Sequence, residues 1–385
     1  MIPYGRQHIT DADIQAVVDV LRSDFLTQGP AVPAFERAVA AKVGAQHAVA
    51  VNSATSALHV ACLALGLGQG DRLWTVPNTF VASANCGRYC GSEVDFVDID
   101  SNTWNMSVVA LKAKLIQARV DGLLPKVVVP VLFAGQPTEQ EAIWALAQEF
   151  GFKVIEDASH AIGASHQGEK VGSCRWSDIT VFSFHPVKII TTAEGGMALT
   201  NHAELAARME MFRSHGITRD AARFAQPAPG AWHYEQQLLG FNYRITDIQA
   251  ALGLSQLGRL GGYLECRNQL AKRYDNLLGH LPLQLPVVLQ GNISAFHLYV
   301  VRIKKNLHAC TRAQVFDALR QAGIGVNVHY MPVHLQPYYR QLGFAEGTFP
   351  AAESYALEAI SLPLYPQLTE DEQDQVVSAL TRALA

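Results

Sequence analysis

The chain has 385 residues, which suggests about two domains of ordinary size. Hydrophobic residues make up 49% of it and charged residues 17%, a composition that excludes a disordered protein because such chains are too polar to bury a core. The formal net charge of −4 excludes a general electrostatic footprint for nucleic acid or an anionic membrane, and leaves room for a local basic site that binds a small anion.

The first ten residues are polar and lead into a helical pattern, so we expect no secretory signal. The most apolar run, residues 127–134, is far shorter than the ~20 residues that span a bilayer. The six cysteines are scattered and form no CxxC pair, which predicts reduced thiols and a cytoplasmic protein. Cys86 and Cys90 lie four apart on a predicted helix, where we expect buried thiols rather than a metal site.

Apolar runs alternate with helical patterns through the first two-thirds of the chain. Near-continuous apolar strands separated by helices favour a mostly parallel sheet that helices cover on both faces. Strands are predicted at residues 48–51, 73–76, 94–99, 127–132, 154–156 and 179–182, and helices at 55–65, 81–89, 139–150 and 202–212.

The pattern changes after this region. Residues 224–240 hold two prolines and two glycines and predict a long loop, and long ordered loops tend to be functional. Residues 245–278 form a long helical pattern that would suit a linker between domains. The remainder predicts a smaller α+β domain, so we divide the chain into residues 1–245 and 246–385. Its predicted strands are 297–303 and 325–329, and its predicted helices are 312–321, 351–359 and 370–383.

The first chemical signal is the segment NSATSAL, which follows a predicted strand and opens a helix at Thr55. Free backbone N–H groups and the helix dipole make such a helix start a phosphate site, and small hydroxyl residues let a phosphate approach. An ordinary N-cap explains the same residues when they are taken alone.

The second signal is a pair of carboxyl groups, Glu156 and Asp157, at the end of an apolar strand, with His160 three residues later. Ligands of parallel sheets bind outside the carboxyl ends of the strands, where a carboxylate can hold a protonated ring nitrogen. A helix cap with a structural histidine is the alternative.

The third signal is Lys188, which follows an aromatic strand and lies among Val187, Ile189 and Ile190. A buried lysine loses its charge readily and is then a good Schiff-base nucleophile. A surface lysine with a buried stem is the alternative. Together, a phosphate cradle, a carboxylate and a lysine are the groups that hold pyridoxal phosphate (PLP), so the three signals predict this cofactor.

With these residues in view, the sequence resembles the DegT/DnrJ/EryC1/StrS family of sugar-nucleotide aminotransferases, essentially from end to end. The resemblance implies an α/β fold of the PLP-dependent transferase fold type I, in which helices flank a mostly parallel central sheet and a smaller α+β domain follows. It rests on the motifs NSATSAL, PNTFVASAN, EDASHAIGA, SFHPVKIITTAEGG, FRSHG, GFNYRITDIQAALGLSQL and HYMPVHLQPYY.

The resemblance also implies roles for single residues. Lys188 matches the Schiff-base lysine, Asp157 matches the carboxylate on the pyridinium nitrogen, and His160 matches the residue beside the 3-oxygen of the cofactor; these three are the expected catalytic residues. The further cofactor contacts are the stacking aromatic Phe80 and the phosphate ligands Ala54, Thr55, Ser183 and Asn242. Asn242 matches an asparagine that reaches the phosphate of the neighbouring subunit, which implies a homodimer.

For the substrate pocket, the resemblance implies contacts from Thr27, Gln28, His185 and His329. His329 and His334 are five residues apart, a pair that could serve as metal ligands, but Pro332 breaks any helical face between them, and we expect no metal. Other templates fail as well. The glycines at 66–70 lack the GxGxxG spacing of a dinucleotide site, and no Walker loop, HExxH or GxSxG motif is found.

The family resemblance implies transfer of the amino group of L-glutamate to C4 of a UDP-4-keto-6-deoxy-N-acetylhexosamine, through PLP and its pyridoxamine form. The wording TTAEGG and ALGLSQL is closest to the branch that makes UDP-4-amino-4,6-dideoxy-N-acetyl-β-L-altrosamine for pseudaminic acid synthesis. Other branches commonly have glycine where Ala193 stands; neighbouring branches use the D-xylo epimer, dTDP sugars or a UDP-pentose.

Two other functions compete with this one. A related PLP-dependent sugar dehydratase carries histidine in place of the Schiff-base lysine, so Lys188 argues against it. A non-catalytic regulator is disfavoured because Lys188, Asp157, His160 and Ser183 are all present.

Overall fold

The computed structural model describes residues 1–304 and 310–385. Its centre is a seven-stranded sheet, and every adjacent pair is parallel except the two pairs that involve β9. The order across the sheet is β1 (His47–Val51), β9 (Gly196–Thr200), β8 (Ile179–Ser183), β5 (Lys153–Asp157), β4 (Val127–Val129), β2 (Arg72–Thr75) and β3 (Glu93–Phe96). The six strands predicted in this region are all present, and the α/β fold class is confirmed.

Strand β9 was not predicted as a strand. It runs antiparallel to both of its neighbours, β1 and β8. Because two reversals restore the direction, β1 still runs parallel to β8 and to the rest of the sheet. The carboxyl ends of β1, β8, β5, β4 and β2 therefore lie at one edge, which is where a doubly wound sheet binds its ligands.

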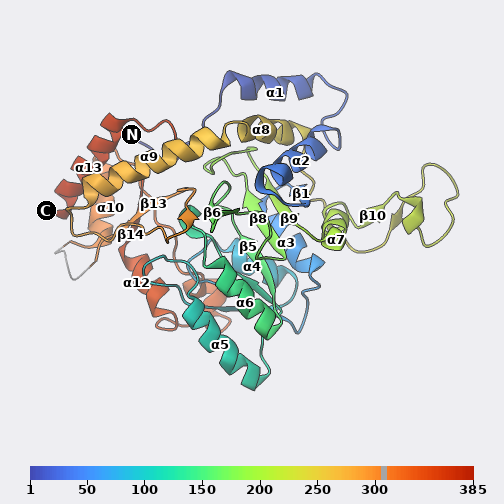
Figure 1. The fold of residues 1–385 in the computed structure, drawn as a ribbon, viewed down its shortest axis with the longest axis horizontal. Helices are drawn as coiled ribbons and strands as arrows, with labels where there is room; N and C mark the ends of the chain where they lie inside the picture. Colours follow the sequence, from blue (N-terminus) through green and yellow to red (C-terminus); the bar gives the residue numbers. More distant parts are fainter. Residues whose placement is uncertain (305–309) are drawn as a thin grey trace.

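Helices cover the sheet on both sides (Figure 1). Helix α3 packs on β8 and β9, α4 packs on β2 and β3, α7 packs on β1 and β9, and α2 packs on β1 and against α8. The predicted helices of this region agree with the observed ones to within one residue, except that two further helices, α2 and α5, were not predicted. The bounds are α2 (Ala31–Val43), α3 (Ala54–Ala64), α4 (Ala82–Tyr89), α5 (Val108–Asp121), α6 (Gln140–Phe150) and α7 (Ala203–Arg213).

The predicted linker helix is two helices, α8 (Asp247–Leu257) and α9 (Leu260–Leu278), which meet at Gly258 and Arg259. They run along the top of the molecule in Figure 1, with α1 (Asp11–Leu21) lying across α8. The buried carboxylate of Asp13 fastens the two layers, since it accepts bonds from Arg259 at 2.5 Å and from Ser255 at 2.6 Å.

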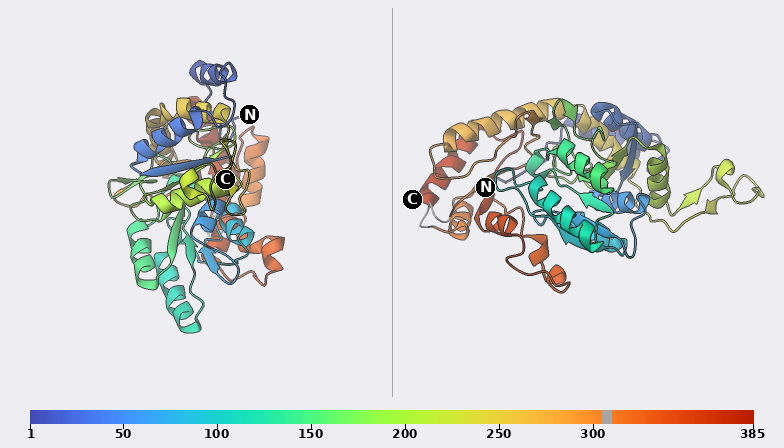
Figure 2. Two further views of the ribbon diagram at one scale, coloured as in Figure 1. Left: turned by 90° about the vertical axis from the view of Figure 1, so that its right-hand side faces the viewer. Right: turned by 60° about the horizontal axis from the view of Figure 1, so that its bottom comes forward.

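An arm projects from the body between α7 and α8, and Figure 2 shows how far it extends. It contains the short antiparallel strands β10 (Ile217–Thr218) and β11 (Glu235–Gln236). The predicted loop at 224–240 is thus largely correct, with β11 inside it. Three large hydrophobic side chains are exposed on the arm, Trp232 at 75%, Tyr234 at 52% and Leu239 at 79%.

The C-terminal part has the predicted mixture of helices and strands. One strand prediction is wrong: residues 325–329 form no strand, because this backbone finds single bridges, from Ile324 to Ile2 and from Asn327 to Ser361, instead of a continuous partner. The observed elements are β13 (Tyr299–Arg302), paired with an unpredicted β14 (Ala359–Leu362), and α10 (Arg312–Gln321), α11 (Pro337–Arg340), α12 (Pro350–Glu358) and α13 (Glu370–Leu384). A small sheet of β12 (Asn292–Ile293), β6 (Ser165–His166) and β7 (Glu169–Lys170) links this part to the first.

One hydrophobic cluster consists mainly of residues from 270 onward, and Ile2 belongs to it. The backbone of Ile2 and Tyr4 also bonds to Gly325 and Leu364, so the N-terminal residues pack with the C-terminal part. The division of the chain near residue 245 stays a proposal. Across residues 1–304 and 310–385, no helix combines the length and the apolar character needed to cross a membrane.

The turn between Lys188 and β9 contains an unusual backbone. Ala193 has φ = +67°, in the left-handed region that favours glycine, and its N–H donates to Thr191 Oγ1 at 2.9 Å. The side chain therefore costs conformational energy where a glycine would not.

We predict that Ala193→Gly stabilises the protein by about 0.5–1 kcal/mol, since relief of the left-handed strain outweighs the extra freedom of glycine when unfolded. The matched control is Ala113→Gly on the exposed face of α5, which should destabilise by about 1 kcal/mol. Urea unfolding of both variants measures the change in the free energy of unfolding, which should be positive for Ala193→Gly and negative for Ala113→Gly. Equal losses would contradict the strain at Ala193.

Candidate active site

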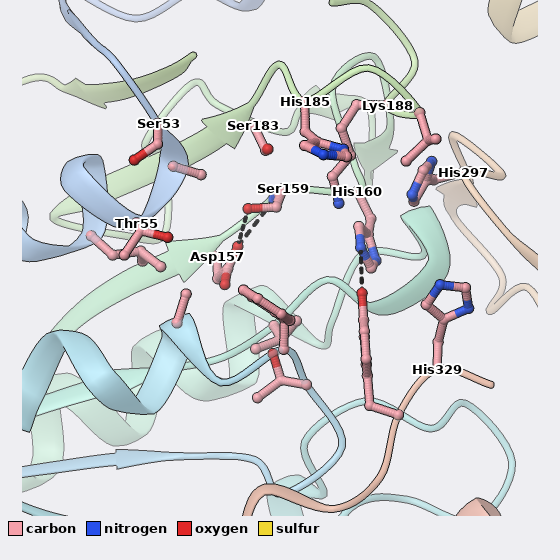
Figure 3. A pocket seen from close by; sticks show the side chains of 18 of the residues that line it. Ser53, Thr55, Asp157, Ser159, His160, Ser183, His185, Lys188, His297 and His329 are labelled. Carbon is pink, nitrogen blue, oxygen red and sulfur yellow. Dashed lines mark hydrogen bonds between the residues drawn. The ribbon is translucent and has the colours of Figure 1, made fainter. Parts of the chain in front are cut away.

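A cavity of about 430 Å³ opens at the carboxyl edge of the sheet (Figure 3), a volume in the usual range for small-molecule sites. It brings together residues from eight separate stretches of the chain. The predicted site residues that line it are Ala54, Thr55, Phe80, Asp157, His160, Ser183, His185, Lys188 and His329.

Asp157 is the last residue of β5, and its carboxylate lines the cavity. It accepts hydrogen bonds from Ser83 Oγ at 2.6 Å and from Ser159 Oγ at 2.5 Å. Because side chains alternate along a strand, Glu156 points to the opposite side, where it bonds to Gln140 and Thr180 in the core. Of the two predicted carboxyl groups, only Asp157 is available to a ligand here.

The start of α3 forms one end of the cavity. Ser53 caps the helix by accepting the N–H of Ser56 at 3.1 Å, and Ala54 and Thr55 line the cavity with it. Gly196 of β9 lies directly behind: a Cβ on it would come within 2.5 Å of the Ala54 nitrogen, so only glycine lets the strand approach the helix start this closely. Ser183, at the end of β8, lines the same region. The N-cap and the predicted anion site coincide here.

Lys188 reaches the cavity from the loop after β8, where its N–H bonds to the carbonyl of His185 at 2.9 Å. Burial lowers the pKa of the Lys188 amine to about 8, and the charge of Asp157 opposes that shift. An amine with this pKa is partly neutral near neutral pH, and a neutral amine is the nucleophilic form.

Three imidazole rings, those of His160, His297 and His329, line one side of the cavity, which we call the far wall. The rings of His160 and His297 pack in a tilted arrangement with centroids 4.5 Å apart, and His329 Nδ1 bonds to Ser361 Oγ at 2.7 Å. Burial is the largest cause that lowers the pKa of each of the three, with the charge of Lys188 contributing, and for His329 the value falls to about 4. All three rings are therefore neutral near pH 7.

His334 does not belong to this wall. It is buried and its Nε2 bonds to Glu353 Oε1 at 2.9 Å, whereas His329 faces the cavity. The two histidines therefore point to different partners. Within the described part of the chain, no group of three or more His, Cys, Asp or Glu side chains is arranged to hold a metal ion.

Phe80 leaves 58% of its side chain exposed although it lines the cavity, and its ring centroid lies 6.3 Å from that of Tyr330. An exposed aromatic face in a cavity of this kind is suited to stacking against a planar ring.

Three predicted site residues lie outside the cavity of this single chain. Thr27 and Gln28 are exposed in a turn that Asp247 holds through the N–H groups of Gly29 and Ala31, both at 2.8 Å. Asn242 is exposed at the base of the arm, in a bridge with Ser214.

Sequence reasoning missed several cavity residues, chiefly Tyr4, Thr79, Glu194, His297 and Tyr330, and it missed Ser83, which bonds to Asp157 from behind the lining. Tyr330 stands beside His329 in HYMPVH, so its signal was present and was assigned to the histidine alone. His297 and Tyr4 carry no local signal, because only the folded chain brings them to the cavity.

The comparisons with known proteins agree on a family. The model of the DegT/DnrJ/EryC1/StrS aminotransferase family matches residues 7–381. The spore coat polysaccharide biosynthesis protein SpsC of Bacillus subtilis is 40% identical over 382 residues, which cover 98% of this chain and 96% of that protein.

Solved structures of aminotransferases share the fold. Helicobacter pylori PseC, an aminotransferase involved in the biosynthesis of pseudoaminic acid, is 32% identical with a TM-score of 0.90, covering 100% of this chain and 99% of that one. The PMP form of the putative sugar aminotransferase Spr1654 from Streptococcus pneumoniae is 29% identical with a TM-score of 0.89 and the same coverage. Spr1654 is also known in a PLP form. The chain therefore belongs to the DegT/DnrJ/EryC1/StrS family of PLP-dependent sugar aminotransferases.

Proposed function

We propose that this protein transfers the amino group of L-glutamate to C4 of a UDP-4-keto-6-deoxy-N-acetylhexosamine. The acceptor that we favour is UDP-2-acetamido-2,6-dideoxy-β-L-arabino-hexos-4-ulose, and the product is then UDP-4-amino-4,6-dideoxy-N-acetyl-β-L-altrosamine for pseudaminic acid synthesis. The observation that carries the proposal is that one cavity joins the Lys188 amine, the Asp157 carboxylate and the start of α3.

The residues of the cavity fit PLP in chemical type. The free N–H groups at the start of α3, with the hydroxyls of Thr55 and Ser183, suit its phosphate. Asp157 suits its protonated ring nitrogen, the exposed face of Phe80 suits its ring, and Lys188 suits its aldehyde. We assign His160 to the neighbourhood of its 3-oxygen. When bound, PLP supplies an aldehyde that carries the amino group and a ring that takes up electrons.

The chain itself then has three tasks. With the cofactor bound, Lys188 Nζ would take the proton from the α-carbon of the amino donor as general base and would deliver it, as general acid, to the former aldehyde carbon of the cofactor. Asp157 is held by Ser83 and Ser159, and it keeps the proton on the ring nitrogen by its negative charge. The imidazoles of His160 and His297 are neutral, so the Lys188 amine is the group in this part of the cavity that can be positively charged and can transfer a proton.

The acceptor rests on weaker support than the reaction class. At 32% identity, PseC favours the pseudaminic route, and TTAEGG and ALGLSQL point the same way. His329 and His185 line the cavity where a sugar would enter. The alternative acceptors are the UDP-D-xylo epimer, a dTDP sugar or a UDP-pentose. A dehydratase is disfavoured by Lys188, and a regulator by the complete set of cavity residues.

We propose a homodimer with shared active sites. Asn242, Thr27 and Gln28 lie outside the cavity of their own chain, and the arm exposes Trp232 and Leu239. In a dimer, Asn242, Thr27 and Gln28 would reach ligands in the partner subunit's cavity, and the exposed side chains of the arm would pack against the partner subunit. We also propose a cytoplasmic location, since all six cysteines are unpaired.

Replacing Lys188 with alanine should abolish transamination, by at least about 10³-fold, because Lys188 is the one lysine that lines the cavity in the described part of the chain. The fold should persist, since the loop backbone keeps its bonds. The matched control, Lys112→Ala on exposed α5, should retain activity. Steady-state rates and circular dichroism measure the two effects, and a fully active Lys188→Ala would refute the proposal.

The protein without cofactor should capture PLP faster as pH rises, with a midpoint of about 8, because the neutral Lys188 amine is the reacting form. Asp157→Asn should move that midpoint lower, because the charge of Asp157 raises the pKa of the amine. Stopped-flow absorbance measures both. A midpoint near 10.5, the ordinary value for lysine, would show that the amine is not desolvated.

The acceptor is tested by a single turnover. The enzyme is first converted to its pyridoxamine form with L-glutamate, freed of excess, and mixed separately with each C5 epimer of the UDP-4-keto-6-deoxy sugar. We expect the PLP absorbance to return quickly only with the L-arabino epimer. Return with the D-xylo epimer alone would keep the chemistry and change the pathway.

A further inference from the structure

The far wall of the cavity contains a hydrogen-bonded chain of three groups. The N–H of Ala134 donates to His160 Nδ1 at 3.3 Å, and His160 Nε2 lies 3.3 Å from the hydroxyl of Tyr330, as the dashed line in Figure 3 marks. Ala134 has φ = +58°, a conformation that L residues rarely adopt, so its N–H is directed at the ring by a strained turn.

The direction of this chain follows from its first link. A backbone N–H can only donate, so Nδ1 of His160 has to be the acceptor and carries no hydrogen. The ring is neutral, because burial lowers its pKa well below the ordinary value. A neutral imidazole holds one hydrogen, which is then on Nε2. His160 therefore donates to the hydroxyl oxygen of Tyr330.

The hydrogen of the Tyr330 hydroxyl then needs an acceptor of its own. Within residues 1–304 and 310–385, His160 is the one hydrogen-bond partner of that hydroxyl, and its capacity is already used. Tyr330 lines the cavity, and burial raises the pKa of its phenol, so the hydrogen stays in place across the working pH range. The free O–H consequently faces the cavity.

The ring of Tyr330 is also held in one orientation. It packs edge-on against Phe133 with centroids 6.3 Å apart, lies 6.3 Å from the ring of Phe80, and its backbone N–H donates to Asn78 Oδ1 at 3.4 Å. A donor fixed before the ligand arrives does not have to reorganise when it binds, which is the arrangement that stabilises an oxygen during a reaction.

We propose that Tyr330 is a catalytic residue that donates a hydrogen bond to an oxygen of the molecule bound in the cavity, with its donor direction set by Ala134 and His160. This inference rests on the proposed function and adds a residue to it. Two oxygens share the required chemistry: the 3-oxygen of PLP and the carbonyl oxygen at C4 of the keto sugar. His160 is then a positioning residue, which acts through Tyr330.

The test is Tyr330→Phe, which removes the hydroxyl and keeps the ring. Its matched control is Tyr339→Phe, since Tyr339 is a buried tyrosine whose hydroxyl bonds to Asn85 at 2.8 Å outside the cavity. Three quantities are measured for each: the affinity for PLP with its absorbance spectrum, the rate of the glutamate half-reaction, and the rate of the keto-sugar half-reaction.

If the acceptor is the C4 carbonyl, Tyr330→Phe slows the keto-sugar half-reaction roughly 100-fold and leaves PLP affinity and the glutamate step near those of Tyr339→Phe. If the acceptor is the 3-oxygen of PLP, the variant shifts the cofactor absorbance, lowers PLP affinity and slows both steps. A Tyr330→Phe protein that matches Tyr339→Phe in all three measurements overturns the proposal.

The donor direction has its own test without cofactor or turnover. In protein labelled with ¹⁵N-histidine, the His160 signals, assigned with His160→Gln, should show a protonated Nε2 and an unprotonated Nδ1. A hydrogen on Nδ1 overturns the proposal. If the unaltered protein fails to respond to glutamate, the proposed function fails, and this experiment still decides the direction of the chain.

Discussion

The active site depends on one electrostatic balance: an amine must lose part of its affinity for a proton inside a cavity that also contains a carboxylate. Burial lowers the pKa of Lys188, and Asp157 alone would raise it. The resulting pKa of Lys188 is about 8. In the same cavity, the Asp157 carboxylate accepts hydrogen bonds from two serine hydroxyls, and the imidazole of His160 is neutral. Most of the fold serves to bring these groups to one edge of a sheet and to keep water from them.

The residues predicted correctly share a local signal. A strand end, a helix start and a lysine between apolar neighbours are each visible within a few residues, and the carboxyl-edge rule then places Asp157, Ala54, Thr55 and Ser183 together. The alternation of strand side chains also separates Glu156 from Asp157, a distinction that the sequence alone left open.

Two of the residues that were missed lie far in the sequence from the other cavity residues, and only the tertiary fold brings them to the cavity. Tyr4 and His297 come from the first few residues and from the C-terminal part, and nothing in their own neighbourhoods indicates the destination. The wrong strand at 325–329 has the same origin, since an apolar run becomes a strand only where a partner runs beside it, and here only isolated bridges form. Strand β9 was overlooked, and one of its two partners, β1, lies far away in the sequence.

The pairing of Ile2 with the C-terminal part has a mechanical consequence. The chain crosses between that part and the sheet region at two places, once through residues 5–10 and once through α8 and α9. The two parts also share the β12–β6–β7 sheet and the main hydrophobic core, to which Val333 and Tyr355 belong, so a shift of one part against the other would disturb these contacts. Tyr4 lies next to the first crossing and lines the cavity, so such a shift would reach the ligand through the N-terminal segment.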